Sequence, residues 1–128
     1  MSADRFTAAR SKAERRGRSS ETLAALWLML RGHRILGRRI RTRAGEIDLV
    51  SLAPFGPVCF IEVKARDGAR TAAEAVTPPQ RARIARAAAL YLAARPALKR
   101  RGARFDIIAI APRAWPRHFR DVWRADEF

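Results

Sequence analysis

Residues 45–64 read GEIDLVSLAPFGPVCFIEVK, two apolar runs of strand length on either side of the turn-forming segment Pro54 to Pro57. Apolar runs of this length, separated by proline and glycine, predict a β-hairpin. Three charged residues interrupt the runs, namely Asp48, Glu62 and Lys64. Because a charge inside a buried strand is costly unless it is paired or binds a metal, these residues are the first candidates for a functional site.

Strand geometry predicts that the three charges lie close together. Side chains alternate along a strand, so Glu62 and Lys64 share one face, about 6.5–7 Å apart. By the same alternation Asp48 is expected on the face opposite Ile47 and Leu49. If the hairpin pairs Asp48 beside Glu62, two carboxylates and one ammonium converge on one patch.

Such a patch has a chemical use. Two adjacent carboxylates repel each other, and a divalent cation relieves the repulsion; Mg²⁺ prefers oxygen ligands and takes one or two protein carboxylates while keeping several waters. The neighbouring Lys64 could activate a water or stabilise charge that builds up on a phosphate. Asp48 followed by Glu62 and Lys64 is therefore what metal-assisted phosphodiester hydrolysis requires.

The pattern also resembles known families. Asp48 with Glu62-Val63-Lys64 fourteen residues later resembles the PD-(D/E)xK nuclease signature, and GEIDLV at 45–50 with IEVKAR at 61–66 resembles the bacterial YraN-like family, over roughly residues 17–128. The fold of that family is similar to that of archaeal Holliday-junction resolvases. The resemblance implies a restriction-endonuclease-like α/β core, ordered helix, three-strand meander, helix, strand, with a mixed sheet flanked by helices.

The function that the resemblance implies is a divalent-metal-dependent DNA endonuclease acting on branched or recombination-type DNA. Asp48 and Glu62 would bind Mg²⁺ or Mn²⁺, with the Val63 carbonyl as a backbone ligand. In the resolvase-like families a glutamate on the first helix completes the site, which implies the same role for Glu21. The alternative is that Glu21 is a first-turn acid that complements the helix dipole. The YraN-like pattern often has glycine where this chain has Ser20.

The charge of the chain indicates a polyanionic partner. There are 27 Lys and Arg against 12 Asp and Glu, a formal net charge of +15, which favours nucleic acid, DNA ahead of RNA, over a membrane. A dense arginine run leads into the hairpin and is a candidate phosphate track, the alternative being a solvated edge strand. The residues predicted to contact nucleic acid are Arg38, Arg39, Arg41, Arg43, Arg66 and Gln80. The family pattern usually has asparagine where this chain has Arg39.

Two helices are predicted. One begins at Ser19 or Ser20 and runs to about Arg31, with apolar residues around nearly its whole circumference, so it is expected to be well buried. The other begins at Thr77, with proline at N1 and Gln80 completing a capping box, and ends near Arg95. Gln80 has a second interpretation near the metal site, where the family pattern usually has lysine.

The remainder of the chain is predicted from the same signals. Residues 103–111 form a buried strand, and the helix before it makes a crossover, so this strand should run parallel to the Glu62 strand. Asp106 is interpreted as structural, paired to an arginine. Lys99 to Gly102 is expected to be a basic turn. The aromatic residues of the last segment, 112–128, are expected to pack over the core.

The chain is expected to be one domain over residues 19–128 behind a basic arm at 1–18, with a loop after Arg66 as a candidate flap. Cys59, the one cysteine, is interpreted as a buried apolar residue, and no disulfide framework or zinc cluster is expected. No membrane span or secretory signal is predicted, so a cytoplasmic location is expected. A homodimer would suit junction cleavage. Two alternatives stay open: a non-catalytic nucleic-acid-binding protein on a nuclease-like scaffold, and a small protein bound to ribosomal RNA.

Overall fold

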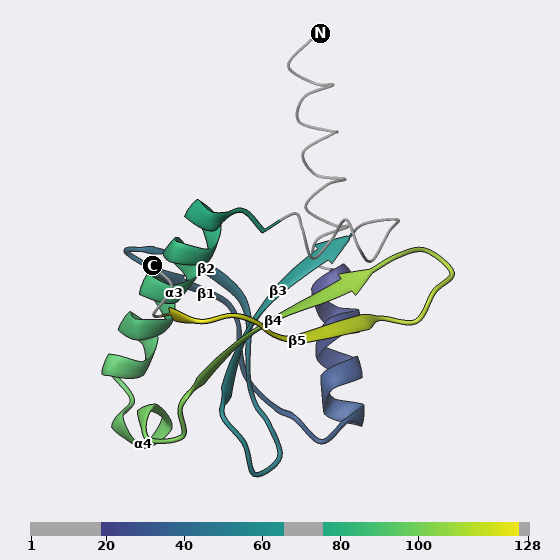
Figure 1. Cartoon of the computed structure of the whole chain (residues 1–128). Helices are drawn as coiled ribbons and strands as arrows, with labels where there is room; N and C mark the ends of the chain where they lie inside the picture. Colours follow the sequence, from purple (N-terminus) through teal and green to yellow (C-terminus); the bar gives the residue numbers. More distant parts are fainter. Residues whose placement is uncertain (1–18, 66–75, 126–128) are drawn as a thin grey trace, which may run out of the picture.

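The computed structural model describes residues 19–65 and 76–125, which form one sheet between helices (Figure 1). A helix over residues 19–30 comes first and is followed by a strand meander. In chain order the further elements are β1 (Arg34–Thr42), β2 (Gly45–Leu52), β3 (Val58–Ala65), α3 (Pro78–Ala93), α4 (Pro96–Lys99), β4 (Ala103–Ile110) and β5 (Arg117–Trp123). The basic arm, Arg66 and the candidate flap lie outside the described residues.

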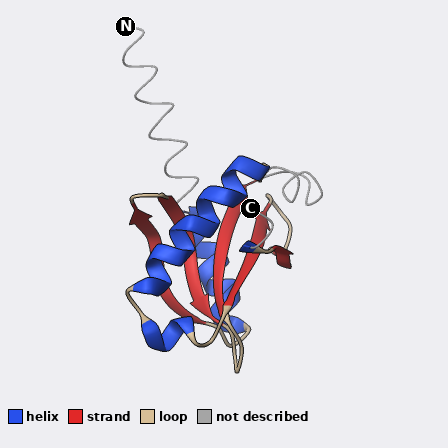
Figure 2. Cartoon of the chain, turned by 60° about the vertical axis from the view of Figure 1, so that its left-hand side comes forward, coloured by secondary structure: helices blue, strands red, loops and turns tan. Residues whose placement is uncertain are grey.

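The sheet has the strand order β1-β2-β3-β4-β5 and is mixed. β1 with β2, β2 with β3 and β4 with β5 pair antiparallel, whereas β3 and β4 pair parallel. A parallel pair needs a crossover, which α3 supplies. The expected mixed sheet flanked by helices is therefore confirmed, and so is the parallel strand over 103–110 (Figure 2).

The predicted hairpin at residues 45–64 is confirmed. β2 and β3 pair from Leu49↔Ile61 to Leu52↔Val58. The turn is closed by the Ala53 N–H, which donates to the Pro57 carbonyl at 3.1 Å. The hairpin thus points its turn and its motif residues toward opposite ends of the sheet.

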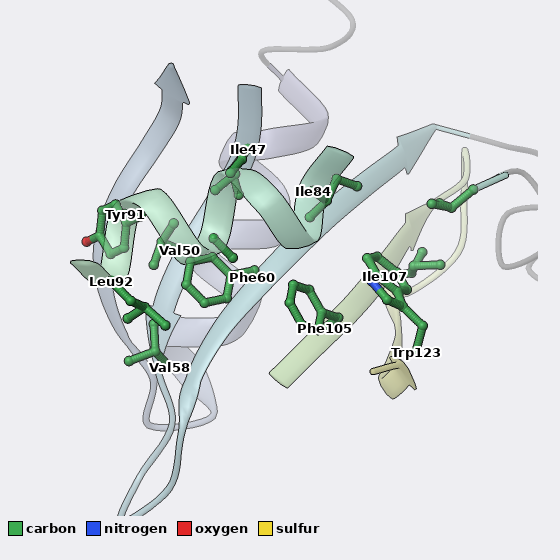
Figure 3. Packing of buried hydrophobic residues seen from close by; sticks show 13 residues of the cluster. Ile47, Val50, Val58, Phe60, Ile84, Tyr91, Leu92, Phe105, Ile107 and Trp123 are labelled. Atoms are coloured by element: carbon green, nitrogen blue, oxygen red, sulfur yellow. The ribbon is translucent and has the colours of Figure 1, made fainter. Parts of the chain in front are cut away.

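The core on the α3 side is aromatic. Phe60 stacks on Phe105 with ring centroids 5.8 Å apart, and Phe105 stacks on Trp123 at 5.3 Å. Tyr91 of α3 meets Phe60 edge-on (Figure 3). Stacked and edge-on contacts of this kind add to the free energy gained by burying apolar area, so this layer fixes α3 against β3 and β4.

The helix over residues 19–30 covers the other face, and the prediction that it is buried all round was wrong. Ala24, Ala25 and Leu28 pack on the sheet, but an outward stripe stays in solvent, comprising Leu23, Leu26, Met29 and Leu30. A helix on the outer side of a single sheet can bury only the stripe that faces the sheet. The helix ends as expected, with Gly32 at φ +88° donating to the Met29 carbonyl.

The second helix confirms its predicted start. Thr77 and Gln80 form the reciprocal capping box, and α3 buries its predicted face, including Ile84 and Tyr91. The prediction of a basic turn from Lys99 to Gly102 was partly wrong, because Lys99 is the last residue of the short helix α4. In the last segment Trp123 is buried as expected, whereas Trp115 is 80% exposed, with its ring centroid 5.9 Å from that of Trp27.

No helix within residues 19–65 and 76–125 is long and apolar enough to span a bilayer. Cys59 is buried as expected, and burial raises the pKa of its thiol to about 11. A thiol with a raised pKa is rarely ionised near neutral pH, which agrees with its interpretation as a small apolar side chain.

Candidate functional site

The three motif residues meet where β2 and β3 lie side by side. Asp48 belongs to β2, and Glu62 and Lys64 belong to β3. The pairing of Leu49 with Ile61 puts the next residues along, Asp48 and Glu62, beside each other. The Lys64 Nζ lies 3.8 Å from the Glu62 Oε1. The predicted convergence of two carboxylates and an ammonium is present.

Asp48 occupies an irregular position that simple alternation did not predict. Ile47 belongs to the core cluster under α3, whereas Leu49 belongs to the cluster under the first helix. These residues are two apart and would share a face in a regular strand, so the expectation that they do was wrong. The Asp48 carboxylate instead accepts a hydrogen bond from the Val63 N–H at 2.9 Å, beyond the paired part of the hairpin. The backbone of β3 thereby holds Asp48 beside Glu62.

The carboxyl pair is electrostatically strained. Burial, together with the charge of Asp48, raises the pKa of Glu62 to about 8. Burial also raises the pKa of Asp48, although the Val63 hydrogen bond opposes that rise. Both shifts disfavour two separate negative charges on this carboxyl pair. A cation bound beside the two carboxyl groups would relieve the repulsion.

Glu21 shares this electrostatic environment. It is buried near the start of the first helix, and its Oε2 accepts a hydrogen bond from the Arg39 Nε at 2.8 Å. The negative charge of Glu21 contributes to the raised pKa of both Asp48 and Glu62. A carboxylate that served only the dipole of its own helix would not influence two groups on the sheet, so Glu21 belongs to this patch.

Arg39 has an unusual backbone. Its φ is +50°, in the left-handed region that non-glycine residues seldom enter. The pairs Arg38↔Leu49 and Ile40↔Ile47 place it opposite Asp48 on the neighbouring strand. Asparagine, the residue of the family pattern at this position, tolerates that conformation better than arginine. Strain of this kind concentrates at functional sites, which points to the same patch.

The donor set suits a hard divalent cation. Asp48 and Glu62 offer carboxylate oxygens side by side, and Glu21 adds a third negative charge nearby. Within the described parts of the chain, no group of three or more His, Cys, Asp or Glu side chains is already arranged around a metal position. Mg²⁺ usually needs only one or two protein carboxylates, since water and substrate phosphates complete its shell. The residues therefore fit Mg²⁺ or Mn²⁺.

Several of the residues predicted to contact nucleic acid already bond to other side chains or to backbone groups of the protein. Arg43 is exposed. Arg38 donates to the Thr22 hydroxyl at 2.8 Å, and the Arg41 Nε lies 3.5 Å from the Glu46 Oε2 at the exposed start of β2. Gln80 is engaged in the capping box. Contact of these residues with nucleic acid stays a prediction, and Arg66 lies outside the described residues.

A second polar cluster was only partly foreseen. Asp106 is fully buried and, as predicted, paired to an arginine: Arg104 donates to both of its oxygens, at 2.9 and 2.8 Å. The His118 Nε2 lies 2.7 Å from the same carboxylate, and the His33 ring lies 6.0 Å from the His118 ring. His33 and His118 are 85 positions apart in the sequence, so no local pattern links them. Only the Arg-x-Asp spacing on one strand face gave a signal.

Comparison with known proteins places the chain among a widespread group. The model described as "Uncharacterised protein family UPF0102" matches residues 20–110. A UPF0102 protein of Paramagnetospirillum magneticum is 48% identical over 122 residues, which cover 92% of this chain and 94% of that protein. A UPF0102 protein of Agrobacterium fabrum is 46% identical over 123 residues, covering 96% and 100% of the two chains. The similarity extends across the whole sheet and the carboxylate patch.

Proposed function

This chain belongs to the UPF0102 family, the YraN-like family, and we propose that it is a divalent-metal-dependent endonuclease of the PD-(D/E)xK superfamily that hydrolyses phosphodiester bonds in DNA. The observation that carries the proposal is the position of Glu62, half-buried between Asp48 and Lys64 with its pKa raised to about 8. A half-buried carboxyl pair of this kind beside an ammonium has no evident role in packing. Perturbed carboxyls gather at functional sites more often than elsewhere.

The residues of the chain have separate roles in this proposal. Asp48 and Glu62 would hold Mg²⁺ or Mn²⁺, with Glu21 and the Val63 carbonyl as further candidate ligands. When bound, the cation supplies positive charge against the phosphate and lowers the pKa of bound water. Lys64 is close enough to Glu62 to hold a water for attack and to stabilise charge that develops on the phosphate oxygens. The Val63 N–H keeps Asp48 in place.

The substrate class follows from charge and analogy. A net charge of +15 suits a polyanion. The arginine-rich strand β1 lies next to β2, the strand that carries Asp48. Branched or recombination-type DNA, and a restriction-endonuclease-like core, rest on the likeness of the family to junction resolvases. Paired cuts across a junction need two sites, so we expect a twofold homodimer.

The test is cleavage of matched linear, flapped and four-way-junction DNA in Mg²⁺ and in Mn²⁺, with wild type beside Lys64→Ala. We expect metal-dependent cutting by wild type and a loss of at least about 100-fold in Lys64→Ala, with DNA binding retained. Equal cutting by the variant would contradict the role of Lys64. Tight binding without cutting in either metal would instead favour a non-catalytic nucleic-acid-binding protein.

A further inference from the structure

A shallow groove of about 440 Å³ lies at the other end of the hairpin from the carboxylates. Its walls come from the first helix end, β1, the hairpin turn and the segment before β4; they are Gly32, Arg34, Leu52, Ala53, Pro54, Phe55 and Arg101. Ala53 lies five positions after Asp48 along the chain, which is roughly 16 Å at about 3.3 Å per residue. The groove is therefore a separate feature from the carboxylate patch, within reach of the same bound strand.

Phe55 stands out among the groove residues. It is fully exposed, and its backbone is left-handed at φ +55°. Bulky non-glycine residues seldom adopt that conformation, and burial of the aromatic ring does not offset it, because the ring lies in solvent. A single exposed apolar side chain is common on protein surfaces. Phe55 differs because full exposure and a left-handed backbone coincide at the tip of a hairpin, beside two arginines.

The arginines give the groove a positive charge. Arg34 is exposed. The Arg101 Nε and Nη2 both donate to the Gly56 carbonyl, at 3.0 and 2.8 Å. These two hydrogen bonds to the hairpin turn fix the plane of the Arg101 guanidinium group. Three of its five N–H donors remain for other partners. Arg100, the neighbour of Arg101, is also exposed, and the described residues that line the groove include no acidic side chain.

We propose that this groove is a second nucleic-acid contact, in which Phe55 stacks on an unpaired or splayed nucleobase while Arg34 and Arg101 bind the adjacent phosphates. An exposed ring flanked by cations is the combination with which proteins hold single strands. Apolar side chains at the tips of loops also wedge between bases at distorted steps. An acidic protein could pair with the two arginines, but it would leave the exposed Phe55 ring without a role. The proposal rests on the nucleic-acid partner of the proposed function and extends it to a site away from the chemistry.

The experiment measures binding without cleavage. Fluorescence anisotropy in EDTA would compare labelled single-stranded DNA, the matched RNA, a forked DNA and a blunt duplex. We expect Phe55→Ala to weaken binding to single-stranded and forked ligands by roughly 5- to 100-fold, with a smaller effect on the blunt duplex. Phe55→Tyr keeps a stacking ring and should bind like wild type. Arg34→Ala should weaken binding to all four ligands and reduce the salt dependence.

Trp115→Ala is the matched control, because Trp115 is an exposed aromatic residue outside the groove; it should bind within about twofold of wild type. Phe55→Ala should melt no lower than wild type, since the Phe55 side chain is fully exposed. The proposal is overturned if Phe55→Ala binds every ligand as tightly as wild type, even when Lys64→Ala abolishes cutting. Wild type that binds no nucleic acid at all would overturn the proposed function together with this contact.

Discussion

Asp106 is the most completely satisfied charge in the described chain. Its carboxylate forms hydrogen bonds with the Arg104 guanidinium, the His118 ring and the Asp121 N–H. Burial alone would raise the pKa of Asp106, but the hydrogen bonds from His118 and Arg104 outweigh burial and lower the pKa to about 2. The cluster joins β4 to the edge strand β5, so its role is structural, unlike that of the strained pair Asp48 and Glu62.

Asp106→Asn should lower the free energy of unfolding by about 3–5 kcal/mol at pH 7, because it leaves buried partners without their countercharge. A carboxyl whose folded pKa lies below its ordinary value of 3.8 stabilises the fold above about pH 4 and loses that effect as the pH falls toward 2. The difference between variant and wild type in urea unfolding should therefore shrink below pH 4. Asp121→Asn, an exposed change that suits the φ of +53° at that residue, should cost less than about 0.5 kcal/mol.

Asp48→Asn tests the proposed metal site on the same scale. Removing one of two repelling carboxylates should raise the melting temperature of the protein in EDTA. Wild type should be stabilised by Mg²⁺ or Mn²⁺, by about 2.7 kcal/mol at a hundredfold excess over Kd, and the variant should lose this gain. Glu46→Gln, an exposed carboxylate on the same strand, should keep it. A wild type indifferent to both metals would contradict the assignment of Asp48 and Glu62 as ligands.

At the scale of elements, the first helix has two apolar faces, of which one is buried against the sheet and the other is exposed to solvent. Leu28 is fully buried against the sheet, whereas Leu30, two residues later, is 82% exposed. The difference comes from the 3.6-residue period, because the two side chains point about 200° apart around the helix. Composition cannot distinguish the faces; the position of the sheet does.

Leu28→Ala should therefore cost about 2–5 kcal/mol of unfolding free energy through lost burial and a residual cavity. Leu30→Ala should change it by no more than about 0.5 kcal/mol. Urea unfolding of the two variants in one buffer makes the comparison. Similar losses in both would mean that another surface covers the outward stripe in solution.

For the whole molecule, the dominant property is its charge. Among the described residues, the arginines of β1, α3 and the α4–β4 segment lie on separate elements of one small domain, so a bound polyanion would meet several of them. Each phosphate contact releases counterions, which makes affinity fall steeply with salt. In the proposed function this charge would supply affinity for nucleic acid in general and no preference among sequences.

We expect DNA affinity to fall by about 10³- to 10⁵-fold between 50 and 200 mM salt if six to ten phosphates are contacted. Titrations at several NaCl concentrations measure this slope, and a neutral osmolyte at equal osmolality serves as the control. A flat slope would show that the basic surface does not bind the backbone of the nucleic acid.

Several elements follow from the sequence alone, because their signals are local. Two apolar runs and the Pro-Phe-Gly-Pro turn determine the hairpin that carries Asp48 and Glu62. Thr77, proline at N1 and Gln80 determine where α3 begins, since a capping box involves only neighbouring residues. The crossover rule then predicts that β4 runs parallel to β3. The three motif residues were found in the same way, as charges within apolar strands.

Other features depend on the tertiary structure, because they arise between segments far apart in the chain. Packing against one sheet decides which face of the first helix is buried, and it brings Glu21 close enough to alter the pKa of Asp48 and Glu62. The break in alternation at Asp48 depends on where the pairing of β2 and β3 ends. His33 and His118 meet only because their segments converge on the sheet. Local periodicity carries no information about such contacts, so only the folded chain assembles them.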